Sequence, residues 1–458
     1  MENVEANIQL GITDHLDPEV QAMLLAMYSR NAAPIATRIP DSEESNQSHK
    51  EKLGKFYVGY NHKSVGQLAS TTIYLEGVSQ LAAKAIENTP LFNGQECSTR
   101  YLPMDTCPMY APEGPHQELI QGFQNEFRNL YIEAMPLTID MLKEQFPFDS
   151  NQGTFHHKES TDQQTTRKLV TWENTIKARA FDICRGLLPA GCTTNVGFVG
   201  TFDSINDHFG EMLYHPCKEM REIAEKTLTQ LAEKYQYAAI PIARQLVTFA
   251  VADGRPEYFY DLHQEYKDPE LEIAHDKEIW PFIQDQAKER LKFEKFAKMH
   301  SDKIQTTFTA VLDFGSYRDI HRHRNGAITM PLLTTDVGFS KYYADQLPEA
   351  IRNKLANLIN RFEDSRVDIP FTKQAYFDWQ YAIPMGYLVS FTYRCDLNQL
   401  LYILELRSGK TVHQTLRHCV QSLAKMLSSL FTNLKLHVDY DEDNFTLKRG
   451  TQTVSDQA

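Results

Sequence analysis

The chain has 458 residues, of which 42% are hydrophobic and 23% are charged, as in an ordinary globular protein long enough for two or three domains. Its formal net charge of −13 argues against a broad surface for nucleic acid polymers, so basic clusters are expected to serve particular anions. No apolar run reaches the roughly 18 residues that span a bilayer, so we expect no membrane partner.

The seven cysteines show no Cys-x-x-Cys pair and no even framework. In a chain of this length, that pattern predicts reduced thiols rather than disulfides or a metal site. The N-terminal segment 1–5 lacks the basic and apolar regions of a secretory signal. We therefore expect a cytoplasmic protein that binds no metal.

The first half of the chain is expected to be mainly helical, with one early strand. The polar segment 41–52 predicts a loop, and Asn93-Gly94 predicts a turn. Hydrophobic periodicity predicts a strand at 69–75 and helices at 18–31, 78–87, 116–146, 168–187 and 219–235.

The second half is expected to mix strands and helices. Residues 240–300 are rich in predicted helix, and the acidic tail from Asp439 onward is expected to fray. Between them, the pattern predicts strands at 305–314 and 387–393 and helices at 344–363, 397–407 and 412–430.

The most basic stretch of the sequence is Ser316–Arg324, which follows the strand predicted at 305–314. If the backbone is extended here, side chains alternate, so Arg322 and Arg324 face one way and His323 faces the other. Two parallel guanidiniums form a site for phosphate or another planar anion. The alternative is a solvated basic face without a ligand.

The sequence contains a weak internal repeat. The segment from Ser70 to Thr89 can be laid on the segment from Gln305 to Arg324 without a gap, and 185–191 can be laid on 380–386. We therefore predict two tandem domains, 1–240 and 241–458.

The two copies differ in the charged groups that they keep. Glu87-Asn88-Thr89 stands where the second copy has Arg322-His323-Arg324, and the first copy alone carries the pattern Glu96-x-Ser98-x-Arg100-Tyr101. In the later segments, Arg185 stands opposite Gln380 and Arg407 opposite Met212. Each copy therefore retains anion-binding groups that the other lacks.

Together these segments resemble the flavin-dependent thymidylate synthase family, whose signature runs Arg-His-Arg, two residues, Ser, four residues, Ser, one residue, Arg. Here the signature is split, since Arg322-His323-Arg324 matches its start and Glu96–Tyr101 its end. The other matching segments are His62-Lys63-Ser64, Arg185 with Leu188-Pro189, and Leu404–Arg407. One departure is that Asn325-Gly326-Ala327 follows Arg324, where the family has a serine.

The resemblance implies an α+β fold of two tandem thymidylate-synthase-complementing-protein-like repeats, each an antiparallel sheet with long helices. It implies an enzyme that methylates C5 of 2′-deoxyuridine 5′-monophosphate (dUMP) to give dTMP. FAD would be the cofactor, with NADPH and methylenetetrahydrofolate as co-substrates. Because the family builds its sites between subunits, we expect a homodimer that forms a pseudo-tetramer.

The resemblance also implies roles for individual residues. Ser98 and Arg100 would act in catalysis, with Ser98 as a positioning residue rather than a nucleophile. The nucleotide would be bound by Glu96, Ser98, Arg100, Arg185 and Arg407. The flavin would be held by His62, Ser64, Arg322, His323 and Arg324.

Other interpretations stay open. The protein is alternatively a non-catalytic nucleotide- or flavin-binding homologue, or it transfers a different one-carbon group to a pyrimidine nucleotide. Glu96, Ser98 and Arg100 also fit a helix cap with a surface ion pair. Arg185 and Arg407 lie near predicted helix C-termini, where positive charge is favourable in any protein.

Overall fold

The computed structural model describes residues 16–29, 38–148, 161–249, 269–275, 278–366, 372–442 and 445–452. The chain divides into two compact units. The first unit contains residues 1–75, 91–95 and 197–253, and the second contains residues 76–90, 96–196 and 254–458. These compact units are not the two domains predicted at 1–240 and 241–458, which were defined by the internal repeat. The division into those domains stays a prediction.

The first unit is mainly helical. Two short helical turns, Met27–Ser29 and Gly54–Gly59, follow its first two helices. Its α-helices are α1 (Pro18–Ala26), α2 (Glu43–Leu53), α3 (Lys63–Gly66), α7 (Phe202–Met212), α8 (Lys218–Lys234) and α9 (Ile242–Phe249).

Helix α2 replaces the loop predicted at 41–52, so that prediction is wrong. The Ser42 hydroxyl caps the helix by accepting a hydrogen bond from the Ser45 N–H at 3.2 Å. Glu43 and Glu44 lie in the first turn, where negative charge is favourable. Capping and helix polarity therefore support α2, although its sequence carries almost no apolar stripe.

A three-stranded sheet has the order β1–β3–β2, and all three strands run through the division between the units. Its strands are β1 (Ser70–Ser79), β2 (Asn93–Glu96) and β3 (Thr193–Thr201). The turn predicted at Asn93-Gly94 is therefore wrong. A Cβ on Gly94 would lie 1.9 Å from the carbonyl oxygen of Gly197, so this glycine permits a close backbone approach.

The second unit contains a four-stranded antiparallel sheet of order β4–β5–β7–β6. The central pair, β5 (Ile304–Asp313) and β7 (Leu388–Asp396), is aligned so that Thr309 faces Thr392. The outer strands are β4 (Glu270–His275) and β6 (Ala327–Thr329). Strand β4 lies within the segment predicted to be helix-rich.

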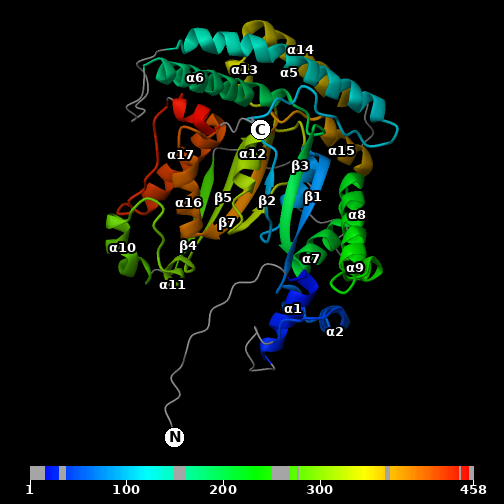
Figure 1. Ribbon diagram of the computed structural model, residues 1–458. Coiled ribbons are helices and arrows are strands. Elements are labelled where there is room, and N and C mark those ends of the chain that lie inside the picture. Colours follow the sequence, from blue (N-terminus) through cyan, green and yellow to red (C-terminus); the bar gives the residue numbers. More distant parts are fainter. Residues whose placement is uncertain are drawn as a thin grey trace. The chain divides into compact units, whose positions relative to one another are not determined.

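Long helices accompany this sheet in the second unit. Helix α5 (Gln117–Gln145) lies beside α6 (Thr161–Cys184), and α14 (Glu349–Ser365) packs on α5 (Figure 1). The other α-helices are α4 (Gln80–Glu87), α10 (Trp280–Glu289), α11 (Lys298–Ser301), α12 (Phe314–His321), α13 (Lys341–Gln346), α15 (Lys373–Trp379), α16 (Leu397–Arg407) and α17 (Gln414–Leu430). No helix in the described ranges is long and apolar enough to cross a membrane.

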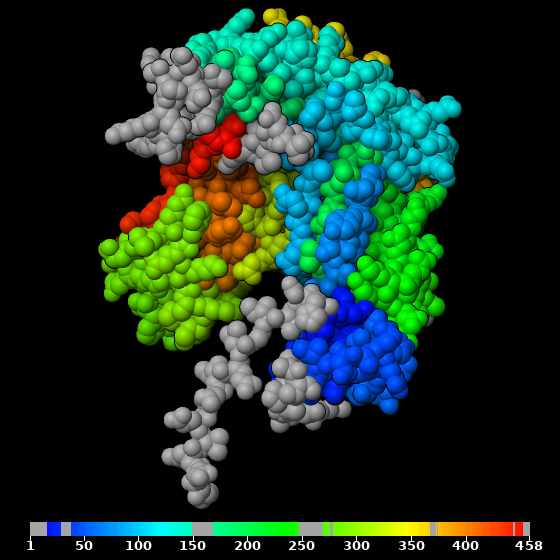
Figure 2. All heavy atoms as spheres, viewed as in Figure 1, coloured from blue at the N-terminus to red at the C-terminus, as the bar shows by residue number. Residues whose placement is uncertain are grey.

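The predicted fraying of the tail is wrong for Leu447–Gln452, which forms a 3-10 helix against α6. In Figure 2 these residues lie in red beside the helix. Arg449, at the centre of this turn, is buried.

The prediction of reduced cysteines also needs correction. Cys107 and Cys192 form a disulfide across 85 residues of sequence, with their Cα atoms 6.4 Å apart. No spacing pattern indicates this pair, because the disulfide joins a loop to the residue before β3. Cys97, Cys184, Cys217, Cys395 and Cys419 are free thiols.

The order of the elements confirms the α+β class with two repeat-like halves. Strand β1 and helix α4 match β5 and α12 in length, and the stretch from Arg185 to Met212 matches the stretch from Gln380 to Arg407 element by element. The first match requires an offset of 234 residues rather than the predicted 235. Arg322-His323-Arg324 therefore corresponds to Asn88-Thr89-Pro90, and Glu87 corresponds to His321.

The two halves meet through reciprocal hydrogen bonds in the second unit. The Ala190 N–H donates to the Ile383 carbonyl at 2.8 Å, and the Met385 N–H donates to the Leu188 carbonyl at 2.8 Å. Ala190 and Met385 occupy corresponding positions, as do Leu188 and Ile383. The contact is therefore pseudo-symmetric, as at the interface of a two-fold dimer.

Candidate functional site

The basic stretch Ser316–Arg324 is helical up to His321, so the conditional expectation of an extended strand is wrong. Asp313 caps α12, because its Oδ1 accepts a hydrogen bond from the Ser316 N–H at 2.8 Å. Helical spacing places Asp319 and Arg322 three residues apart on one face, where they form an ion pair. Arg322 and Arg324 therefore have different carboxylate partners instead of forming a parallel pair.

The carboxylate of Asp319 is the centre of the site. Arg322 donates to its Oδ1. Its Oδ2 lies 3.7 Å from Nη1 of Arg100 and 3.6 Å from Nη1 of Arg185. Guanidiniums from three distant segments thus converge on one buried carboxylate. Burial alone would raise the pKa of Asp319, but the surrounding arginines outweigh it and hold the pKa well below its usual range.

A second carboxylate, Asp182 on α6, holds Arg100 from the other side. Arg100 donates from Nε to Oδ1 at 2.7 Å and from Nη2 to Oδ2 at 3.0 Å, which is a bidentate pair. Arg449 also binds Asp182, at 2.9 Å through Nη2. Burial opposes ionisation, but Arg100 and Arg449 together lower the pKa of Asp182.

Arg407 and His323 form the next part of the cluster. Nε of Arg407 donates to Nε2 of His323 at 2.8 Å, and Nη2 donates to the Asp319 carbonyl at 2.8 Å. Burial, with help from Arg407 and Arg322, lowers the pKa of His323 to about 3. His323 is therefore neutral near pH 7 and can accept this hydrogen bond.

Glu96 pairs with Arg318, one turn of helix before Arg322. Burial raises the pKa of Glu96 to about 7, although the Arg318 guanidinium acts in the opposite direction. The buried Glu96 carboxyl therefore lies close to its titration point at neutral pH, which is a feature of groups that exchange protons or hydrogen-bond a ligand.

Arg324 faces a small cavity of about 140 Å³ that is also lined by Glu87, His321, His323 and Gly326. The Arg324 guanidinium lies 3.4 Å from the carboxylate of Glu87, and His321 Nδ1 lies 3.8 Å from the same carboxylate. The cavity has the size of a phosphate group or a sugar rather than of a whole dinucleotide.

Arg185 is anchored in a fully buried polar network behind Asp319. It donates to the Ser316 hydroxyl at 2.7 Å, and this hydroxyl lies 3.0 Å from Nδ1 of His413. Burial and the nearby Arg185 lower the pKa of His413 to about 3. Because Ser316 and His413 are both 0% exposed, this serine–histidine contact positions Arg185 and is closed to substrates.

The structure brings most of the predicted site residues together in the second unit. The predicted roles of the other two, His62 and Ser64, are not tested by it. Glu96, Arg100, Arg185, Arg322–Arg324 and Arg407 all lie in the second unit. The Ser98 hydroxyl accepts a hydrogen bond from the Arg100 N–H at 3.2 Å and so shapes this loop. His62 and Ser64 lie in the first unit, and their flavin role stays a prediction.

Sequence reasoning did not single out Asp182, Arg318, Asp319 or Arg449 as site residues. Asp319 could have been found, because it lies three residues before Arg322 in a stretch that also fits a helix. Arg449 carried no signal, since a single arginine in a polar tail does not point to a distant aspartate.

The position related by the pseudo-symmetry keeps one cation, Lys84, and has uncharged residues at the other compared positions. Lys84 of α4 corresponds to Arg318 of α12, and its ammonium donates to the Met330 carbonyl at 3.2 Å, where Met330 corresponds to Glu96. Ala85, Asn88, Thr334 and Gln380 stand where the charged site has Asp319, Arg322, Arg100 and Arg185. Within the described residues, the charged cluster therefore occupies only one of the two positions related by the pseudo-symmetry.

Comparisons with known proteins agree with this architecture. Residues 12–235 match the family described as thymidylate synthase complementing protein. The chain is 22% identical to the UPF0159 protein Ta1429 of Thermoplasma acidophilum, over 90% of this chain and 93% of that protein. It is 23% identical to a UPF0159 protein of Chlamydia muridarum, over 89% of this chain and 84% of that protein. Residues 12–235 are therefore similar to the thymidylate synthase complementing protein family, in agreement with the repeated α+β architecture and the split signature.

Proposed function

We propose that the protein is a flavin-dependent, thymidylate-synthase-like enzyme that binds a deoxyuridylate-type nucleotide at the cluster around Asp319. The observation that carries the proposal is the convergence of Arg100, Arg185 and Arg322 on one carboxylate. A nucleotide monophosphate requires several fixed guanidiniums, and this cluster holds them buried and oriented.

The nucleotide would be bound by groups from both repeats. Arg100, Arg185 and Arg407 would supply positive charge for its phosphate. Glu96, whose pKa of about 7 leaves it able to accept or donate a proton, would hydrogen-bond the pyrimidine. Ser98 would act through the loop geometry that it sets for Arg100.

A flavin cofactor fits the residues around Arg322–Arg324 in part. Nε of Arg322 is buried and has no hydrogen-bond partner within the described structure, and the adjacent cavity of about 140 Å³ suits one phosphate group. Arg322, His323 and Arg324 would hold the cofactor there, in competition with the carboxylate of Glu87 for Arg324. When bound, the flavin would supply the redox chemistry, while the protein orients the nucleotide and excludes water.

A second candidate function is favoured by the ion pairs themselves. Arg318, Arg322 and Arg324 each have a carboxylate partner from the protein, so a ligand anion must compete for them. This arrangement also suits a homologue that binds a nucleotide without turnover, or one that transfers a different one-carbon group.

Two measurements test the proposal. The purified protein should show flavin absorbance or bind added FAD. A protein that shows no flavin absorbance and does not bind added FAD would overturn the enzyme assignment. Label release from C5-labelled dUMP, with methylenetetrahydrofolate and NADPH present, should then separate the candidates, since a binder that lacks turnover cannot replace the C5 hydrogen.

Variants assign the binding roles. Arg100→Lys keeps a positive charge but loses the bidentate geometry, so dUMP affinity should fall about tenfold or more. Arg361→Lys is the matched control, because Arg361 pairs with Glu126 on an exposed surface. Equal dUMP affinity in both variants would remove Arg100 from the nucleotide site.

A further inference from the structure

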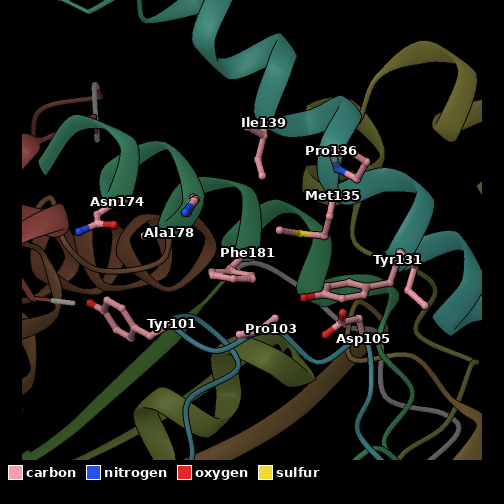
Figure 3. A pocket seen from close by; sticks show the side chains of 12 residues that line it. Tyr101, Pro103, Asp105, Tyr131, Met135, Pro136, Ile139, Asn174, Ala178 and Phe181 are labelled. Carbon is pink, nitrogen blue, oxygen red and sulfur yellow. The ribbon is translucent and has the colours of Figure 1, made fainter. Parts of the chain in front are cut away.

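A larger cavity in the second unit is used by none of the roles given above. It has a volume of about 540 Å³ and lies between α5, α6 and the loop after Arg100 (Figure 3). Sites for small organic molecules range from about 300 to 1,000 Å³, so this volume suits one drug-sized ligand. No guanidinium of the Asp319 cluster lines it.

Aromatic side chains from three segments form the walls. Tyr101 comes from the loop, Tyr131 from α5 and Phe181 from α6. Figure 3 shows Tyr101 toward one end, beside Asn174, and Tyr131 with Asp105 toward the other, with Phe181 between the two ends. Flat faces at several points of one cavity favour a planar, aromatic occupant.

Two residues that line this apolar cavity, Ile132 and Asp105, carry hydrogen-bond acceptors. Pro136 lies inside α5 and has no N–H, so the carbonyl of Ile132 lacks its usual helical donor. Both residues line the cavity, as does Asp105, whose side chain Figure 3 shows at the end near Tyr131. These acceptors favour a ligand with N–H groups.

Tyr131 supplies a complementary donor. Its hydroxyl accepts a hydrogen bond from the Met104 N–H at 3.4 Å, and burial raises its pKa, so it remains protonated. The hydroxyl hydrogen is thus available to an acceptor such as a ring nitrogen. The end of the cavity near Asp105 thus offers both acceptors and a donor. A nitrogen heterocycle with an amino group needs both, because its amino group donates and its ring nitrogen accepts.

We propose that this cavity binds a planar heteroaromatic molecule that carries an amino group next to a ring nitrogen. The ring lies among Tyr101, Tyr131 and Phe181, and the amino group donates to Asp105. The site is separate from the guanidinium cluster, although Arg100 and Tyr101 are adjacent in sequence. Arg100 binds Asp182, whereas the Tyr101 ring lies 5.2 Å from the guanidinium carbon of Arg449 and lines the cavity.

The test is a titration of the intact protein with 2-aminoquinoline, which is fluorescent and has the required amino and ring nitrogen groups. Ile132→Trp should fill the cavity and weaken binding at least about tenfold, as expected when a binding pocket is blocked. Leu137→Trp is the matched control, because Leu137 lies on the same helix and is 41% exposed, against 43% for Ile132, but does not line the cavity.

Two further comparisons test the polar part of the proposal. Asp105→Asn should weaken 2-aminoquinoline binding about tenfold, the loss expected for one charge-assisted hydrogen bond, and should leave the binding of unsubstituted quinoline unchanged. Asp105 is exposed, so this variant should fold normally.

Several results would overturn the proposal. These are absence of binding by the wild-type protein, equal binding by Ile132→Trp and Leu137→Trp, and equal effects of Asp105→Asn on both probes. A change in sedimentation on Ile132→Trp, without probe binding to the wild type, would assign the surface to a contact between copies instead.

Discussion

At the scale of single residues, the buried Asp319 carboxylate keeps the guanidinium cluster together. Arg100 approaches it from a loop, Arg185 from the turn after α6, and Arg322 from the C-terminal end of α12, which also carries Asp319. Without a counter-charge these guanidiniums would repel each other in a poorly solvated environment. An anionic ligand could supply the same negative charge as the Asp319 carboxylate. Binding of an anion and stability of the folded protein should therefore be coupled.

Asp319→Asn should therefore destabilise the protein and make it depend on added anions. Removing one partner of a buried ion pair costs about 3–5 kcal/mol. Inorganic phosphate should raise the melting temperature of the variant more than that of the wild type, because phosphate can replace the lost carboxylate. Thermal unfolding in phosphate, against chloride at equal ionic strength, measures this difference.

Asp345→Asn serves as the control for this substitution, because Asp345 pairs with Lys341 on an exposed surface. It should change stability by at most about 1 kcal/mol, with no special response to phosphate. A similar phosphate response in Asp319→Asn, Asp345→Asn and wild type would contradict an anion site at the cluster.

His413 should make the protein sensitive to acid. Its pKa is about 3 when folded and near its ordinary value of 6.5 when unfolded, so between these pH values only the unfolded state gains a proton. The contribution of neutral His413 to the free energy of unfolding is thus fully present above about pH 6.5. Below that pH, the free energy of unfolding falls by about 1.4 kcal/mol per pH unit toward pH 3.

His413→Gln removes this titration, so the slope of unfolding free energy against pH between 6 and 4 should decrease by about 1.4 kcal/mol per pH unit. The slope is the informative quantity, since the substitution also changes the hydrogen bonds of Ser316. Denaturant unfolding at a series of pH values measures it. An unchanged slope would show that His413 titrates normally in the folded protein.

At the scale of elements, the sequence predicted those helices and strands whose hydrophobic pattern reflects burial. Helix α16 agrees with its predicted bounds at 397–407, and α5 and β7 differ from theirs by only a few residues. Helix α2 and the turn around Arg449 were not predicted, because capping and a distant ion pair stabilise them. Neither interaction leaves a periodic pattern in the sequence.

The same distinction applies to the candidate site. Arg100, Arg185 and Arg322 were found because their positions match motifs in order. Asp182 and Asp319 were missed as site residues, because carboxylates that hold arginines in place belong to no motif. The pair of Asp319 and Arg322 could still have been inferred from helical spacing, whereas Asp182 meets Arg100 and Arg449 only through tertiary structure.

The Cys107–Cys192 disulfide should stabilise the protein, because it closes a loop of 85 residues. Restricting such a loop in the unfolded chain contributes about 4.6 kcal/mol in the chain-entropy model. Reduction, or Cys107→Ser, should thus lower the midpoint of denaturant unfolding, whereas Cys97→Ser, at a free thiol, should not. Equal midpoints for oxidised and reduced wild type would contradict this expectation.

At the scale of the whole molecule, the two repeats make equivalent contacts but keep different chemistry. The reciprocal hydrogen bonds of Ala190 and Met385 show that the halves still meet as two copies would. Arg318 crosses to Glu96 in one direction, and Lys84 crosses to the Met330 carbonyl in the other. Only the first of these crossings joins opposite charges, so among the described residues the charged site occupies one of the two positions related by the pseudo-symmetry.

The chain should therefore bind one nucleotide rather than two. Calorimetric titration with dUMP should give a stoichiometry near one per chain. Arg318→Met should weaken binding at least about tenfold, because it removes the guanidinium that holds Glu96 in place. Lys84→Met, the equivalent substitution in the other repeat, should leave both affinity and stoichiometry unchanged. Two equal sites per chain, or equal losses in the two variants, would mean that the second position had kept its function through residues other than the charged ones.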